Sequence, residues 1–97
     1  MPTSAEYAAE VARIAEVARQ WVADNPHKKV EIVWRTSDKV QVIGLFADAI
    51  KMGFVKVNAD GMELLKAMGV DPANYNEPSV IMVRTALDSL EKGKDEP

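Results

Sequence analysis

The stretch from residue 29 to residue 58 most constrains how this chain can fold. It opens with the β-branched and aromatic run Lys29-Val-Glu-Ile-Val-Trp34 and closes with Phe54-Val-Lys-Val-Asn58, and residues of these types favour strands. Between the two runs, polar residues recur at steps of three and four, which is a helical spacing. The polar stripe consists of Ser37, Gln41, Gly44, Asp48 and Lys51. The pattern therefore predicts a βαβ unit with a helix over residues 38–52.

Two features qualify the prediction for this central unit. The segment 39–43 could also be the return arm of a hairpin, but the polar stripe favours the helix. Gly53 is placed to end that helix in a left-handed conformation, with Phe54 as the apolar contact that often follows. A crossover helix between two strands normally makes the strands parallel, so we expect a parallel pair.

Helices are expected on both sides of this unit. Thr3 and Glu6 have the spacing of a capping box, which predicts a helix running to about Asp24, before Asn25-Pro26. After the second strand, the residues from Asp60 to Glu63 repeat the capping pattern. They predict a short helix over 61–68 that ends at Gly69.

The last element is ambiguous between helix and strand. Residues 78–92 read as one helix with Pro78 at its first position and Val80, Val83, Leu87 and Leu90 facing inward. Alternatively, residues 80–85 form a third strand, because a bare two-stranded parallel sheet is a poor structure. We favour the single helix. If residues 80–85 are not a strand, a second chain should lie beside the sheet.

The predicted architecture is a single α+β (or small α/β) domain over residues 1–93, with the order α-β-α-β-α-α and a frayed tail at 94–97. A chain of 97 residues is too short for two cores. It contains no cysteine and one histidine, His27, so thiolate chemistry and cysteine-rich metal sites are excluded. No phosphate-binding glycine motif or bilayer-spanning apolar run is present. We therefore expect a cytoplasmic protein with no catalytic residues, metal site or cofactor.

Charge is unevenly distributed along the chain. The formal net charge is −3, yet residues 25–56 hold six bases and three acids, while both flanking segments are acidic. This basic segment is a candidate for contact with a nucleic-acid backbone. Lysines near a strand edge also have a simpler use, because they discourage edge-to-edge aggregation. The candidate residues are His27, Lys28, Lys29, Arg35, Lys39, Lys51 and Lys56.

A second candidate site follows from the expected parallel pairing. The carboxyl ends of parallel strands meet at one edge, where helix N-termini can hold an anion. The residues at those ends are Arg35, Thr36, Ser37, Asn58 and Asp60. The simpler interpretation is that Ser37 only caps a helix and that Arg35 is solvated.

Association with a protein is the function that the sequence favours most. A sheet of two or three strands leaves an edge unpaired, and the five methionines include several that could lie on an adaptable apolar surface. We therefore expect a small accessory, regulatory or inhibitory protein that binds a protein partner or a second copy of itself, for example as a homodimer. Nucleic-acid binding ranks second and anion binding third.

Overall fold

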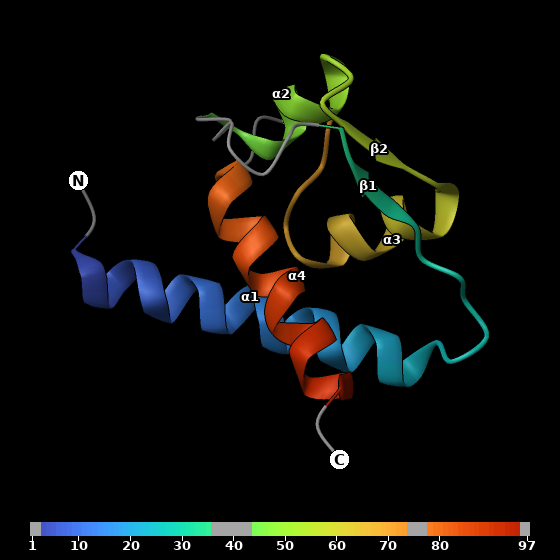
Figure 1. The fold of residues 1–97 in the computed structure, drawn as a ribbon, viewed down its shortest axis with the longest axis horizontal. Helices are drawn as coiled ribbons and strands as arrows, with labels where there is room; N and C mark the ends of the chain where they lie inside the picture. Colours follow the sequence, from blue (N-terminus) through green and yellow to red (C-terminus); the bar gives the residue numbers. More distant parts are fainter. Residues whose placement is uncertain (1–2, 36–43, 74–77, 96–97) are drawn as a thin grey trace.

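The computed structural model describes residues 3–35, 44–73 and 78–95. Within them lie four helices and two strands, in the expected order: α1 (Ser4–Asp24), β1 (Ile32–Trp34), α2 (Phe46–Lys51), β2 (Val55–Val57), α3 (Ala59–Ala67) and α4 (Val80–Asp95). The fold is a small α+β domain (Figure 1). The predicted fold class is therefore confirmed.

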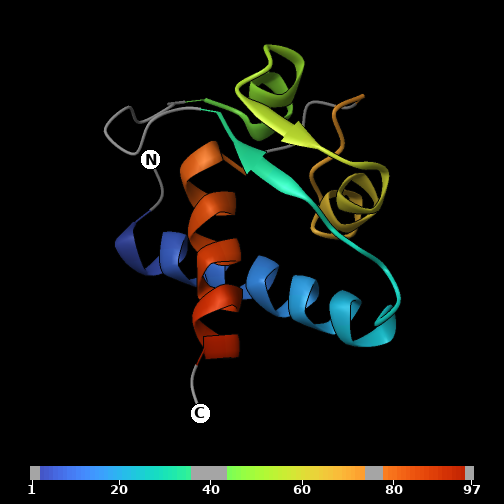
Figure 2. The same cartoon turned by 45° about the vertical axis from the view of Figure 1, so that its right-hand side comes forward.

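The first helix begins and ends where the sequence predicts. The Thr3 hydroxyl accepts a hydrogen bond from the Glu6 amide at 3.1 Å, and Asn25 caps the other end by donating to the Trp21 carbonyl. Ile14 and Ala18 are fully buried on the inner face of α1. That face crosses α4, as Figures 1 and 2 both show.

The two strands are antiparallel, so the predicted parallel pairing is wrong. Ile32 lies opposite Val57, Val33 opposite Lys56, and Trp34 opposite Val55. The α2 helix has only six residues and is followed by a tight turn at Gly53, where φ is +82°. The connection between the strands ends beside the carboxyl end of β1, where Val55 lies opposite Trp34, so β2 runs back along β1. The side chains of β1 alternate between the two faces of the sheet, with Ile32 and Trp34 packed on the core and Val33 52% exposed.

The α2 helix is shorter than the predicted helix over 38–52. Leu45 precedes it in an extended conformation and Gly44 has a positive φ of +150°, while residues 38–43 lie outside the described residues. Leu45 forms a β-bridge with Ser79, and the Val80 amide donates to the Gly44 carbonyl at 3.0 Å. These bonds tie the start of α2 to the start of α4.

Residues 80–85 are helical, so the alternative of a third strand is wrong and the single C-terminal helix is confirmed. The α4 helix starts two residues after Pro78, and the Ser79 hydroxyl accepts a hydrogen bond from the Met82 amide.

The α3 helix starts earlier than predicted, because Asn58 caps it in place of Asp60. Gly69 ends α3 with φ +90°, in the left-handed conformation expected from the sequence.

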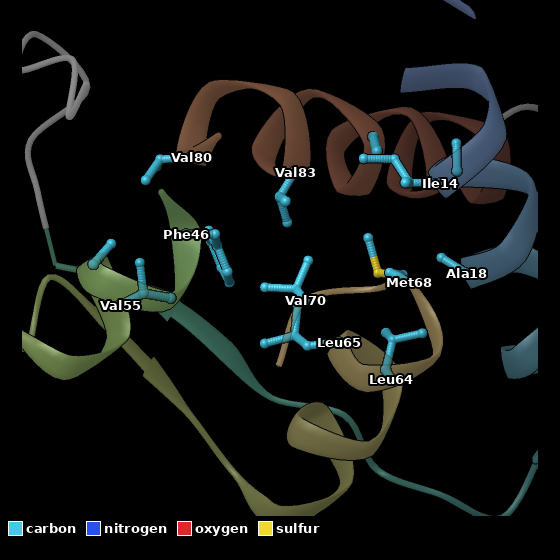
Figure 3. Close-up of a cluster of buried hydrophobic side chains, with 13 residues drawn as sticks. Ile14, Ala18, Phe46, Val55, Leu64, Leu65, Met68, Val70, Val80 and Val83 are labelled. Atoms are coloured by element: carbon cyan, nitrogen blue, oxygen red, sulfur yellow. The ribbon is translucent and has the colours of Figure 1, made fainter. Parts of the chain in front are cut away.

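The core gathers side chains from every helix and from β2 (Figure 3). Phe46, Leu65, Met68, Val70 and Val83 are fully buried at its centre. Trp34 reaches this core from β1 and packs edge-to-face on Phe46, with ring centroids 5.6 Å apart. The Arg84 guanidinium also contacts Trp34 and lies 5.1 Å from its ring centroid. Trp34 thus connects the sheet to α2 and α4 through direct side-chain contacts.

Candidate functional site: an open strand edge beside an apolar groove

One edge of β1 has no strand beside it in the described part of the chain. The Arg35 amide donates to the Phe54 carbonyl at 2.8 Å, and the Glu31 carbonyl accepts from the Asn58 amide at 3.1 Å. Backbone groups of an antiparallel strand alternate between its two sides. The amides and carbonyls of Ile32 and Trp34 therefore point away from β2, toward an edge that no described residue pairs with.

A groove of about 570 Å³ runs along this edge. Figure 1 shows β2 on one side of β1, with α4 and the C-terminal half of α1 on the other. Leu64 of α3, Leu87 and Leu90 of α4 and Val22 of α1 give the groove an apolar lining. The full lining is Arg19, Val22, Val30, Glu31, Ile32, Val33, Trp34, Leu64, Leu87, Asp88, Ser89 and Leu90.

Charged residues mark the two ends of the β1 edge. Arg35 follows the carboxyl end of β1, and Arg84 is close by because it stacks on Trp34. Glu31 precedes the amino end, and Asp88 lies one helical turn beyond Arg84. The strand edge therefore has Glu31 before its amino end and Arg35 after its carboxyl end, with the exposed Val33 between them. Arg19, which also lines the groove, forms an ion pair with Glu16.

The side chain of Asn58 holds the amino end of β1 in place. Its Oδ1 accepts hydrogen bonds from the Gly61 amide at 2.7 Å and from the Glu31 amide at 3.0 Å. Its Nδ2 donates to the Lys29 carbonyl at 2.6 Å. Asn58 thus caps α3 and anchors the segment that leads into β1, and its polar atoms are used within the fold.

The residues of the predicted anion site do not converge. Because the strands are antiparallel, Arg35 lies at one end of the sheet and Asn58 at the other. The carboxylate of Asp60 accepts from the Lys29 amide and lies 3.8 Å from the Lys28 ammonium. Thr36 and Ser37 are outside the described residues.

The predicted nucleic-acid residues are spread over several elements. The Lys28 ammonium lies 3.3 Å from a Glu63 carboxylate oxygen as well as near Asp60, so acidic side chains of α3 surround it. Arg35 and Lys56 are exposed on the outer face of the sheet, and Lys51 ends α2. His27 and Lys29 are exposed in the segment before β1, and Lys39 is outside the described residues.

A second, more acidic depression of about 640 Å³ lies beside the N-terminal half of α1. There the pKa of Glu10 is lowered from its ordinary value because the Arg13 guanidinium donates a hydrogen bond to it, and the pKa of Arg13 is raised by the same bond. Its lining is Glu6, Tyr7, Glu10, Gly44, Leu45, Pro78, Ser79 and Met82.

Residues 3–35, 44–73 and 78–95 contain neither a metal-binding cluster nor a membrane-spanning helix. No three acidic or histidine side chains there are grouped so that they could hold a metal ion. No helix there is long and apolar enough to cross a bilayer.

Sequence reasoning missed the groove but not its individual residues. Val22, Leu87 and Leu90 fall on the inward faces of their predicted helices, and Leu87 and Leu90 do pack against the core. What the sequence does not encode locally is the separation between β1 and the two helices. Only the tertiary arrangement turns these partly buried side chains into the wall of a groove.

Comparison with known proteins finds no relative of this chain. No protein-family model, curated protein or solved structure matches this chain. The site therefore has to be interpreted from its own geometry.

Proposed function

We propose that this chain is a small, non-enzymatic accessory or regulatory protein of the cytoplasm that acts by binding another protein chain along the open edge of β1. One observation carries the proposal, namely that backbone groups of Ile32 and Trp34 with which no described residue pairs border an apolar groove. An unpaired strand edge is a template for a further strand, and a neighbouring groove selects the side chains of that strand.

The sheet itself gives a second reason. A two-stranded sheet is marginal in isolation and gains from a third strand. Residues 80–85 cannot supply that strand because they are helical. Of the two sources weighed from the sequence, a strand from another chain is the one that remains.

Selection from a library of displayed random peptides tests the proposal, with a groove-filling variant as the control. Ser89 is an exposed residue of α4 that lines the groove, so Ser89→Trp should fill it without disturbing the core. Ala12→Trp adds the same bulk to an exposed position of α1 that does not line the groove. We expect apolar peptides to be enriched that bind wild type and Ala12→Trp but not Ser89→Trp.

Two results would contradict the proposal. One is that no peptide is enriched, or that the enriched peptides bind Ser89→Trp as well as wild type. The other is micromolar, steeply salt-dependent binding of nonspecific DNA by a monomer, which is the behaviour expected of a nucleic-acid-binding protein.

A further inference from the structure

The shape of the groove limits what can pair with β1. Its lining comes from β1, from α4 and from the C-terminal half of α1, with one further residue from α3. In Figure 1, α4 and the C-terminal half of α1 lie on the side of β1 away from β2. A second folded copy that paired through its own β1 would bring its β2 and its helices along with that strand. A single extended segment needs only the space next to the strand, about 4.8 Å from it.

We propose that the groove binds one extended segment of a partner protein, antiparallel to β1, which carries an acidic residue, three apolar residues and a basic residue in that order. This inference rests on the proposed function and adds the chemistry of the partner. Its basis is the order of charges along β1 and the lining of the groove.

The charge order follows from the register. A segment bonded to the backbone of Ile32 and Trp34 places its outward side chains opposite Glu31, Val33 and Arg35. These are non-hydrogen-bonded pairs, in which opposing side chains are closest and opposite charges stabilise the pairing. In an antiparallel segment, the first of these positions faces Arg35 and the last faces Glu31. The first should therefore be acidic and the last basic.

The three positions between the charged ends face apolar surface. The middle residue lies opposite Val33, whose side chain is 52% exposed in the unbound chain. The two residues beside it point inward, toward Leu64, Leu87 and Leu90. Covering these side chains removes apolar area from water, which favours binding.

The sequence of β1 itself has this order, from Glu31 through Ile-Val-Trp to Arg35. A synthetic peptide Lys-Val-Glu-Ile-Val-Trp-Arg, capped at both ends and labelled with fluorescein, is therefore a suitable probe. The matched control has the same composition, with its Glu and Arg exchanged. Fluorescence anisotropy against the full chain measures binding of both peptides.

We expect the first peptide to bind wild type about 10-fold more tightly than the exchanged peptide, because two attractive cross-strand pairs become repulsive. The double variant E31R/R35E should reverse the preference. Both side chains are exposed and make no hydrogen bond or ion pair among the described residues, so the fold should tolerate the exchange. Ser89→Trp should abolish binding, and Ala12→Trp should not.

Three results would overturn this inference. If both peptides bind equally and Ser89→Trp still blocks them, the charge order is wrong although the groove remains a peptide site. If neither peptide binds, the stated chemistry is wrong, and the displayed-peptide selection decides the proposed function separately. If light scattering gives a dimer in which the Ile32 and Trp34 amides are protected from exchange, a second copy occupies the edge and the inference is wrong.

Discussion

At the scale of single residues, Asn58 and Gly61 position the amino end of β1. Asn58 combines an α3 cap with two contacts to the segment before β1, which requires both an acceptor and a donor on one side chain. Gly61 lies where α3 touches that segment. A Cβ there would be 2.6 Å from a Val57 methyl and 3.1 Å from the Glu31 carbonyl oxygen. The amino end of β1 is thus positioned by close contacts that tolerate few substitutions.

The first prediction concerns Asn58→Asp. Aspartate is normally a good N-cap, but here it loses the Nδ2 donor and places a carboxylate against the Lys29 carbonyl. We expect urea denaturation to give a loss of about 1–2 kcal/mol in the free energy of unfolding. Thr3→Asp is the matched control, because Thr3 only accepts a hydrogen bond, and it should be neutral or slightly stabilising. Equal stability of Asn58→Asp and wild type would contradict the role assigned to Nδ2.

The second prediction concerns Gly61→Ala, whose sign distinguishes two effects. Helix propensity alone would stabilise the variant by about 1 kcal/mol. The close approach of Val57 and the Glu31 carbonyl instead predicts a loss of about 1–3 kcal/mol, from overpacking against backbone that cannot easily move. Chemical denaturation gives the sign directly, and a stabilised variant would show that the contact between α3 and this segment is looser than these distances imply.

At the scale of elements, local patterns predict the kind and order of the helices and strands but not how they pair. The α1 boundaries follow from the capping box and Asn25-Pro26, and the inner face of β1 follows from alternation. The prediction of parallel strands rested on a connecting helix over residues 38–52, whereas α2 has only six residues. Residues 44–45 lie in a stretch with a helical polar pattern, yet they are not helical, because Leu45 forms a bridge with Ser79 and the Gly44 carbonyl accepts from the Val80 amide. Such long-range bonds cannot be deduced from local spacing.

The third prediction tests the register of β1 through adjacent residues. Trp34 packs on Phe46 and Arg84, so Trp34→Ala should cost about 3 kcal/mol of unfolding free energy. Val33 points outward and is 52% exposed, so Val33→Ala should cost less than about 0.5 kcal/mol. A similar cost for both variants in thermal or urea unfolding would mean that the faces of the strand are assigned incorrectly.

The fourth prediction concerns the turn between α2 and β2. Gly53 has φ +82°, and a Cβ added to it would meet no atom within 4 Å, so only backbone strain opposes a substitution. We expect Gly53→Ala to lose about 1 kcal/mol and Gly53→Asn to lose less, because asparagine tolerates left-handed geometry better. Urea denaturation measures both variants, and equal stability of the alanine variant and wild type would contradict the left-handed conformation of Gly53.

At the scale of the whole molecule, the helices cover one face of a sheet whose β1 edge stays open among the described residues. Sequence reasoning correctly indicated that a small sheet would leave an edge unpaired. It did not locate the groove, because the groove exists only where α1 and α4 stand apart from β1. The predicted anion site depended on parallel strands, and antiparallel pairing places its two halves at opposite ends of the sheet.

Amide hydrogen exchange at β1, resolved by residue with NMR, tests the central claim most directly. In the unbound chain, the Ile32 and Trp34 amides should exchange much faster than the Arg35 amide, which is bonded to the Phe54 carbonyl. Saturation with the peptide Lys-Val-Glu-Ile-Val-Trp-Arg should slow exchange at Ile32 and Trp34 and leave Arg35 little changed. Protection of the Ile32 and Trp34 amides already in the unbound monomer would contradict the claim, since the edge would then be covered by the chain itself.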